Sequence, residues 1–435
     1  MRVAVIGAGV SGIATAFYLR QQNIDVDLYE AEERIGGRIG SEQLLARRVD
    51  FGGKNIGRHY TLFREFVKTC GDPEFEYFGL NTSQLVNNRV VRISRENSRL
   101  MNLIRILKLC GFEGFRKLDP QVRAILDDRS QGVLGSDYFI KISELYDHMT
   151  LAGYLNKRCV NNVVRPITIR MNGAEPEECY PGNFGSNLAL VLDSYEQLKE
   201  GMHGLLDAFR NLKGSGSLRI LASHRVNSVS TDPATGKVRI GYEHRGIRET
   251  AVYEKAISAL PALRLAALLD ENLPKAANLL RQIRYYPVAV AIVRYRNPVF
   301  RSDCRAMMFD SSIALSNAGA YGINDLDLVR YTFSGRVSRS TISEYSAPEA
   351  VVGLGEEITS PYFTLRGNPR EAFVYRYLPE GLCAYSPCHH ELLGKIDKEF
   401  EQIPGFAATG DYRRGASIEA CFRAAGESVV KLSGE

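Results

Sequence analysis

The stretch Val3-Ala4-Val5-Ile6-Gly7-Ala8-Gly9-Val10-Ser11-Gly12 decides the fold of this 435-residue chain. Its four apolar residues indicate a buried strand, and the glycine turn leads directly into a helix that we expect over residues 13–21. Gly7 permits the tight turn, Gly9 lets the backbone approach a pyrophosphate, and Gly12 lets the helix pack closely on the strand. The N-terminus of the helix would then face the phosphates of a dinucleotide.

A second apolar strand, Val26 to Tyr29, ends in Glu30. An acidic side chain at this place can accept hydrogen bonds from both hydroxyls of an adenosine ribose, whereas a phosphorylated ribose would be repelled. Strand, glycine turn, helix, second strand and acid occur in the expected order. The pattern therefore predicts an α/β, Rossmann-type nucleotide-binding domain.

The next two segments resemble a known superfamily of flavoproteins. Residues Glu30 to Arg38 are similar to the segment of monoamine oxidases, protoporphyrinogen oxidases and phytoene desaturases that crosses the FAD diphosphate. Residues Val49 to Gly57 are similar to the segment that runs past the flavin ring in the amine oxidase branch. A side chain at Gly52 or Gly53 would project into the space of the planar ring, so we expect bare backbone to contact it. A glycine turn after an edge strand is the alternative.

The C-terminal residues Thr409-Gly410-Asp411 resemble the closing FAD motif of the same superfamily. There a strand ends in Gly-Asp, and the acid meets the ribityl-phosphate region. A helix capped by Ser417 would aim its N-terminus at the cofactor. Ala420 and Ala425 replace the usual glycine and serine, but both are small enough to keep the close packing.

The resemblance thus implies FAD as the cofactor. Val226 follows a strand expected over Leu218 to Ala222, after which the superfamily's backbone holds the adenine. The residues that we assign to FAD are Gly7, Gly9, Val10, Ser11, Gly12, Glu30, Ala31, Gly37, Arg38, Gly52, Gly53, Lys54, Asn55, Val226, Gly410, Asp411, Ser417 and Ile418.

The resemblance covers nearly all of the chain and implies a two-domain fold. The FAD domain would comprise 1–75, 183–265 and 380–435, and the substrate domain would comprise a mostly helical insertion, 76–182, and an antiparallel sheet, 266–379. Within these ranges we expect a helix over Tyr195 to Leu212, a hairpin turn at 232–237 and a strong strand over Tyr286 to Tyr295. A helix over 100–112 would pack on its neighbour; a membrane surface or the mouth of a substrate tunnel is the alternative.

Chemistry in such a flavoprotein is hydride removal from carbon, with the flavin as acceptor and the protein supplying orientation. The amine oxidase branch usually has a lysine near the flavin, and the alignment puts Val290 at that position. The absence of this lysine argues against ordinary oxygen-driven amine oxidation. It leaves room for desaturation, or for imine formation followed by ring closure.

Pocket residues are predicted from their positions alone. Those following the glycine pair include His59, although solvated loop positions would look the same. Arg330 and Arg336 could hold an anionic or carbonyl-bearing substrate, and Tyr375 and Tyr377 could wall the pocket or occupy alternate positions of an ordinary strand. The candidate catalytic residues are Lys54, Asn55, Tyr60, Arg330 and Tyr377.

Composition agrees with a soluble globular protein. Hydrophobic residues make up 45% and charged residues 24%, and the net charge of +5 comes without a basic run, so nucleic acid is not implied. No apolar stretch approaches the ~20 residues of a membrane span. Since Met1 lies directly before the first strand, we see no room for a signal peptide and predict a cytoplasmic location.

The eight cysteines are scattered, as expected for reduced thiols. Cys383, Cys388, His389 and His390 lack a second ligand pair, so we predict no metal. Cys383 lies close to where monoamine oxidases carry a cysteine joined to the flavin; a plain thiol is the alternative.

We therefore predict an FAD-dependent oxidoreductase that removes a hydride from a C–N or C–C bond of a small organic substrate, by amine or amide oxidation or by desaturation. Oxygen or another acceptor would take the electrons, and a homodimer is left open. A flavin-dependent isomerase or cyclase without net redox change and a non-catalytic nucleotide-binding protein are the alternatives.

Overall fold

The computed structural model describes residues 1–77, 81–86, 89–94, 99–212, 216–301, 304–310 and 312–433. Its first domain is built on a parallel sheet with strand order β10-β2-β1-β14-β20. These strands are β1 (Arg2–Ile6), β2 (Asp25–Tyr29), β10 (Leu218–Leu221), β14 (Lys255–Ser258) and β20 (Phe406–Ala408). Three distant parts of the chain thus build one sheet, which confirms the predicted α/β class.

Helices and a small sheet cover the two faces of this parallel sheet. Successive side chains along β1 belong alternately to two different apolar clusters, as expected for a strand that is buried on both faces. One cluster includes α1 (Val10–Gln21), α2 (Thr61–Thr69), α9 (Met202–Arg210) and α16 (Ile418–Ser433). The other includes α10 (Ala262–Leu269), α11 (Pro274–Leu280), α14 (His389–Phe400) and the antiparallel strands β11 (His224–Thr231), β12 (Val238–His244) and β13 (Ile247–Tyr253). The hairpin turn expected at 232–237 joins β11 to β12.

The second domain has a larger sheet of order β19-β15-β18-β17-β16-β7-β8. Its strands are β7 (Asn81–Val86), β8 (Arg89–Ser94), β15 (Arg284–Tyr295), β16 (Ala306–Met308), β17 (Leu315–Ala320), β18 (Leu328–Phe333) and β19 (Arg370–Ala384). All pairs are antiparallel except β16 with β7. The strand expected over 286–295 is confirmed as part of β15.

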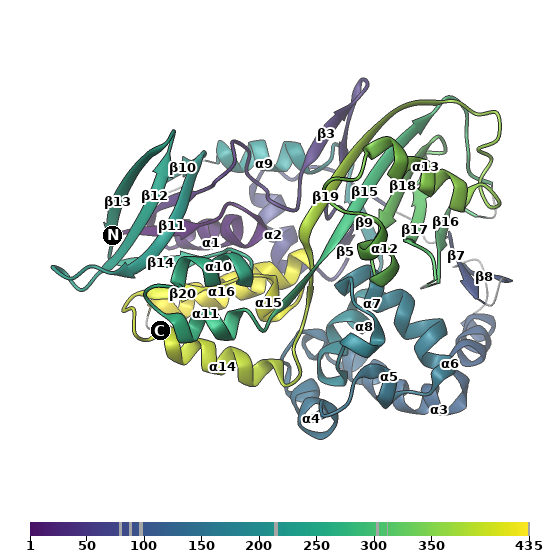
Figure 1. Ribbon diagram of the computed structural model, residues 1–435, viewed down its shortest axis with the longest axis horizontal. Helices are drawn as coiled ribbons and strands as arrows, with labels where there is room; N and C mark the ends of the chain where they lie inside the picture. Colours follow the sequence, from purple (N-terminus) through teal and green to yellow (C-terminus); the bar gives the residue numbers. More distant parts are fainter. Residues whose placement is uncertain are drawn as a thin grey trace.

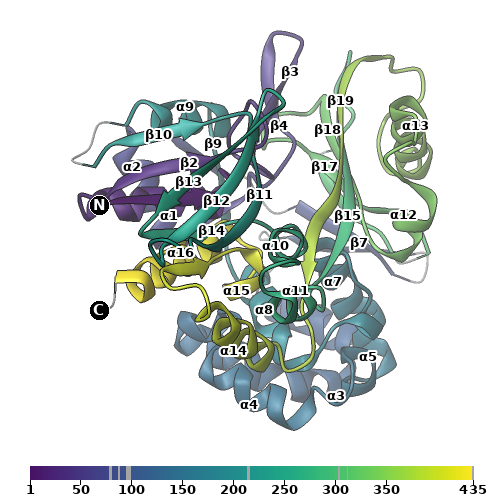
Figure 2. The same ribbon diagram turned by 60° about the vertical axis from the view of Figure 1, so that its left-hand side comes forward.

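The two faces of this larger sheet have different neighbours. One face packs against α12 (Arg336–Thr341) and α13 (Pro348–Thr359), and the other meets the hairpin of β3 (Ser41–Leu44) and β4 (Arg47–Asp50). Figure 2 shows α12 and α13 on one side of the sheet and β3 and β4 on the opposite side. The second face is therefore the one turned toward the nucleotide-binding domain.

The helical insertion lies beneath the larger sheet in the view of Figure 1. It contains α3 (Arg99–Asp127), α4 (Asp137–Tyr146), α5 (Leu151–Tyr154), α6 (Lys157–Cys159), α7 (Arg165–Asn172) and α8 (Phe184–Val191), with short 3-10 and π turns between them. The helix expected over 100–112 forms the start of α3, whose backbone leaves helical geometry at Gly111. The side chains of 99–103 and 106 lie outside the described residues. Among the described helices, none is long and apolar enough to cross a membrane.

Two expectations differ from the structure. Tyr195 to Leu212 is not one helix: β9 (Tyr195–Leu198) pairs with β5 (Ile56–Gly57) and β6 (Phe75–Tyr77), and Gly201, with a φ of +79°, turns the chain into α9. Pairing with distant strands overrides local preference there. In addition, α10 and α11 pack beneath the parallel sheet, so the chain enters the substrate domain near 284 rather than at 266, and position 380 falls inside β19.

Candidate active site

The glycine turn between β1 and α1 has the shape that a pyrophosphate needs. Gly7 has a φ of +96°, and a Cβ at Gly12 would lie 1.8 Å from the Gly7 carbonyl oxygen, so the helix packs directly on the turn. A Cβ at Gly9 would meet nothing within 4 Å, and no side chain caps the N-terminus of α1. The first amides of the helix therefore face open space, as phosphate binding requires.

Glu30 is held beside this turn by its own neighbours. Its Oε2 accepts the Ala8 amide hydrogen at 2.9 Å and its Oε1 accepts that of Glu32 at 2.9 Å. The His224 amide donates to the Glu30 carbonyl oxygen at 2.8 Å, which brings the start of β11, and with it Val226, to the same edge. The residues predicted for ribose and adenine thus lie at one end of the parallel sheet.

Arg38 and Asp411 join the two ends of the chain. Arg38 Nη1 lies 2.7 Å from Asp411 Oδ2, and the Tyr285 hydroxyl donates to Asp411 Oδ1 at 2.7 Å. Burial alone would lower the pKa of Arg38, but the Asp411 carboxylate outweighs burial and raises it. Asp411, predicted to meet the ribityl-phosphate region, therefore has both carboxylate oxygens engaged and orients Arg38.

The glycine pair 52–53 has two different reasons for its lack of side chains. A Cβ at Gly52 would lie 1.9 Å from the Arg38 carbonyl oxygen, so Gly52 is required by a close crossing of two backbone segments. This corrects the expectation that both glycines clear space for the ring. Gly53 is exposed, and a Cβ there would meet only Ile39 Cγ2 at 3.7 Å and Ile418 Cδ1 at 3.8 Å.

The helix of the closing motif begins as predicted. Ser417 Oγ accepts the Ala420 amide hydrogen at 3.0 Å, and α16 starts at Ile418. In the first turn of this helix, the Glu419 carboxylate accepts the amide hydrogens of Leu62 and Phe63 at 3.1 and 3.0 Å. The closing motif is thereby fixed to α2, the helix that follows the glycine pair.

Arg330 serves the backbone of the glycine segment. From β18 it donates to the carbonyl oxygens of Asp50, Phe51 and Gly52 at 3.0 to 3.1 Å. Burial lowers the pKa of its guanidinium. Since these three acceptors engage it, Arg330 positions the segment; the structure gives no support for the predicted role in substrate binding.

Lys54 leads into a buried polar junction between the domains. Its side chain is 3% exposed, and Nζ donates to Gln197 Oε1 and to the Tyr321 carbonyl oxygen, each at 2.6 Å. Burial, reinforced by the nearby Arg330 guanidinium, lowers the pKa of Lys54 well below that of a free lysine. Asn55, the next residue, is exposed.

Tyr60 and His59 differ sharply in surroundings. Tyr60 is buried against the side chains of Ser417 and Tyr195, and burial raises the pKa of its hydroxyl well above the usual value. His59 is half exposed, with Nδ1 2.8 Å from Asp193 Oδ1. Of these two, only Tyr60 lies close to the closing FAD motif.

Tyr375 and Tyr377 lie on the wrong face of the sheet to wall this site. They pair with Ala291 and Ala289 of β15 and belong to the cluster beneath α13. Alternate residues of β19, such as Val374, face the β3–β4 side. Arg336 is exposed at the start of α12, where its backbone amide donates to Glu175.

Cys383 has 0% exposure, and burial, followed by the nearby Asp411 charge, raises the pKa of its thiol well above the usual value. Neither property supports a covalent bond to flavin. Over the described ranges, no group of three or more His, Cys, Asp or Glu side chains is arranged to hold a metal ion.

One cross-strand row of the larger sheet lines the side on which the glycine segment lies. The register pairs Val290 of β15 with Thr332, Thr332 with Asn317, and Asn317 with Met308. Thr332 is two residues from Arg330 on β18 and so shares its face. Sequence reasoning missed Thr332, Asn317 and Tyr195, although the period-two alternation of β17 and β18 could have assigned the faces of Asn317 and Thr332.

Comparison with known proteins agrees with this geometry. The sequence model for flavin containing amine oxidoreductases matches residues 10–321. Prenylcysteine oxidase 1 from Homo sapiens is 29% identical over 194 residues, which are 39% of this chain and only 37% of that protein. A putative protoporphyrinogen oxidase from Exiguobacterium superposes with a TM-score of 0.72 at 15% identity, covering 100% of this chain and 99% of that one.

Cyclohexylamine oxidase from Brevibacterium oxydans IH-35A superposes with a TM-score of 0.72 at 17% identity, over 100% of this chain and 98% of that one. At such identities these structures establish the fold. The sequence match, which covers most of the chain, confirms the predicted flavin cofactor, FAD. The chain belongs to the family of flavin containing amine oxidoreductases.

Proposed function

We propose that the protein is an FAD-dependent oxidoreductase that removes a hydride from a C–N or C–C bond of a small organic substrate. The observation that carries this proposal is the meeting of three segments at Gly53. Its exposed backbone has Ile418 of the closing motif as a neighbour, and Arg330 of the substrate sheet fixes the preceding residue, Gly52. Cofactor and substrate domains therefore share one boundary at the predicted flavin position.

FAD, when bound, would accept the hydride, and the protein would hold and orient the reactants. The open amides of α1 would bind the pyrophosphate, Glu30 the ribose, and Arg38 the diphosphate side. Arg330 keeps the Gly52 backbone against the sheet. Thr332 and Asn317 would offer neutral hydrogen-bonding groups to the substrate.

The position that aligns with the family lysine carries no amine. Val290 is 3% exposed and packs with Phe51 and other apolar side chains. The nearest lysine in sequence to the glycine pair, Lys54, has its amine engaged by Gln197 and Tyr321. These contacts favour hydride removal without a lysine-held water, and thus desaturation or an amine oxidation of unusual outcome.

The first test is the visible spectrum of the purified protein before and after acid precipitation. We expect an FAD spectrum that is released to the supernatant. Anaerobic addition of substrates should then bleach the flavin; a prenylcysteine, a protoporphyrinogen and cyclohexylamine sample the chemistry named in the relatives. A colourless protein that does not take up FAD would overturn the proposal. The isomerase or cyclase would instead be favoured if product forms from the substrate without net oxidation and without oxygen uptake.

The electron acceptor, the cytoplasmic location and a homodimer stay predictions. Reoxidation of the reduced flavin by oxygen or by a quinone would identify the acceptor. Cell fractionation and light scattering coupled to gel filtration would test the other two.

A further inference from the structure

Arg170, on the last turn of α7, is a cation for which the described residues supply no acidic partner. Its Nη1 lies 2.6 Å from the sulfur of Met308, and within the described parts of the chain this is its one hydrogen-bond contact. A thioether is a weak acceptor, whereas a guanidinium offers five donors in a fixed fork. Most of the hydrogen-bonding capacity of Arg170 is therefore unused by the protein.

Arg170 is surrounded by protein without being fully covered. Protein surrounds it closely enough that burial lowers the pKa of its guanidinium, yet its side chain keeps part of its accessible surface. The hydroxyl of Tyr195 is near enough to act on it electrostatically, and Tyr195 in turn adjoins Tyr60. Arg170 thus lies on the side of α7 that faces the flavin-binding residues.

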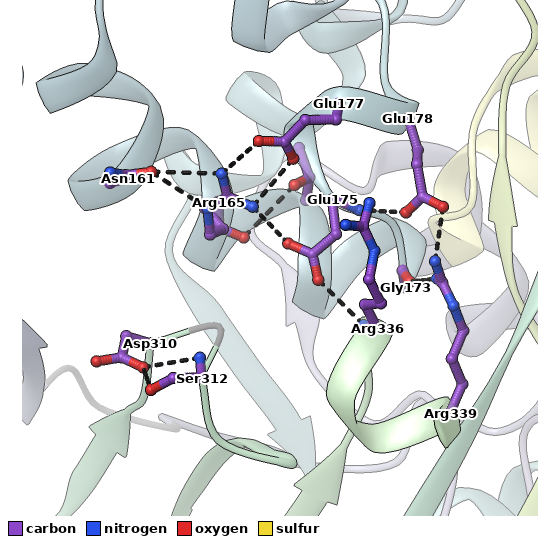
Figure 3. A network of polar contacts seen from close by, with 11 residues as sticks. Asn161, Arg165, Gly173, Glu175, Glu177, Glu178, Asp310, Ser312, Arg336 and Arg339 are labelled. Atoms are coloured by element: carbon purple, nitrogen blue, oxygen red, sulfur yellow. Dashed lines mark hydrogen bonds and ion pairs between the residues drawn. The ribbon is translucent and has the colours of Figure 1, made fainter. Parts of the chain in front are cut away.

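Two other arginines near α7, Arg165 and Arg339, are engaged by carboxylates. Arg165 lies between Glu175 and Glu177, with Nη1 2.7 Å from Glu175 Oε2 (Figure 3). Arg339 bridges the Gly173 carbonyl oxygen, at 2.9 Å, and the Glu178 carboxylate, at 2.6 Å. These contacts tie both ends of α7 to η3 (Pro176–Glu178) and α12, so the Arg170 backbone is held in place before any ligand arrives.

The sheet connects Arg170 to the predicted site of oxidation. Met308, which Arg170 touches, pairs with Asn317, which pairs with Thr332 on the strand of Arg330. Neighbouring strands are about 4.8 Å apart, so Met308 and Thr332 lie roughly 10 Å apart along this row. This span suits a small molecule with one reacting end and one anchored end.

We propose that Arg170 is the anchor for a carboxylate at the end of the substrate remote from the oxidised bond. A carboxylate accepts two parallel hydrogen bonds from a guanidinium and supplies the missing counter-charge. Asn317 and Thr332 would line the path between the two ends. The inference rests on the proposed function, because it assigns the substrate class of that site.

The test uses the FAD-loaded protein and two simple probes of equal shape, benzoate and benzamide. Binding is measured by calorimetry and by the perturbation of the flavin spectrum. We expect benzoate to bind at least 10-fold more tightly than benzamide to the natural protein, and Arg170→Met to abolish this preference. Arg170→Lys, which keeps the charge but not the fork, should restore part of it.

Arg158→Met is the matched control, since it removes an exposed arginine from α6, the α-helix that precedes α7 along the chain, and should leave the preference unchanged. The inference is overturned if the natural protein binds the two probes equally, or if Arg170→Met keeps the preference for benzoate. In either case, a protein that binds FAD leaves the proposed function standing. A purely structural role of Arg170 predicts a lowered unfolding temperature with the preference intact. Failure to bind FAD would instead overturn the proposed function.

Discussion

Arg38 Nη1 and Asp411 Oδ2 are 2.7 Å apart, although 372 residues separate them along the chain. Asp411 is buried, whereas the Arg38 side chain remains 35% exposed. The carboxylate therefore holds one side of the guanidinium and leaves the other side accessible. This pair closes the nucleotide-binding domain around its predicted diphosphate site, and it explains how the first and last motifs act together.

Replacing Asp411 by Asn should destabilise the protein by about 2 kcal/mol and weaken FAD binding, because the buried carboxylate loses its charge-assisted hydrogen bond to Arg38. Thermal unfolding of the apoprotein and FAD titration measure the two effects. Asp270→Asn provides the control, since Asp270 and Arg281 form an exposed pair and should contribute less than about 1 kcal/mol. Equal effects of the two substitutions would contradict the role given to Asp411.

Replacement of Gly52 by alanine should impair folding, whereas replacement of Gly53 by alanine should impair FAD binding. Gly52→Ala places a methyl group 1.9 Å from the Arg38 carbonyl oxygen, so we expect a poorly folded protein. Gly53→Ala makes only ordinary contacts, at 3.7 Å or more, and should leave the unfolding temperature of the apoprotein nearly unchanged. Its methyl group would meet the flavin instead, so FAD affinity should fall about 10-fold or more. A stable Gly52→Ala protein with normal FAD binding would be the contrary result.

Arg330→Lys should affect the cofactor site and spare the substrate anchor. One ammonium cannot reach the three carbonyl oxygens that the guanidinium bonds, and each buried acceptor left without a donor costs about 1–3 kcal/mol. We expect a lower unfolding temperature and faster loss of FAD. Benzoate affinity, measured on the fraction that retains FAD, should stay within about 2-fold of the natural protein. A selective loss of benzoate binding would restore Arg330 as a substrate residue.

The sequence predicted the backbone geometry around the proposed nucleotide site because the requirements of that geometry are local. A glycine turn, a strand-ending acid and a capped helix each depend on neighbouring residues, and Gly7, Glu30 and Ser417 lie as expected. The clash that demands Gly52 depends on Arg38, whose carbonyl reaches it only in the folded chain. Local pattern reasoning could therefore assign the glycine but not its cause.

The substrate side was harder to predict for the same physical reason. Arg170 comes from an inserted helix and reaches the sheet only through tertiary packing, so no motif marks it. Tyr377 and Val374 lie on the same strand but point to opposite faces of the sheet. The position of the β3–β4 hairpin, not the strand itself, decides which face is turned toward the predicted cofactor site. Polar residues of β17 and β18 carried a usable signal in their alternation.

Burial of the Lys54 amine, which lowers its pKa, predicts a pH dependence of stability. Its pKa in the folded state lies well below the 10.5 of a free lysine, so unfolding takes up a proton at any pH between these two values. The contribution of Lys54 to stability therefore rises as pH increases through this window and becomes constant above about 10.5.

Lys54→Met removes this titration. As pH increases from 7.5 to 9.5, the unfolding temperature of the natural apoprotein should therefore rise relative to that of the variant. Titratable groups elsewhere in the protein are common to both proteins and cancel in the difference. Lys199→Met, which alters an exposed lysine paired with Glu74, is the control and should show no such trend. A difference that stays flat, or that moves in favour of the variant as pH rises, would mean that the Lys54 amine is charged in the folded protein, with Gln197 and Tyr321 sufficient to stabilise that charge.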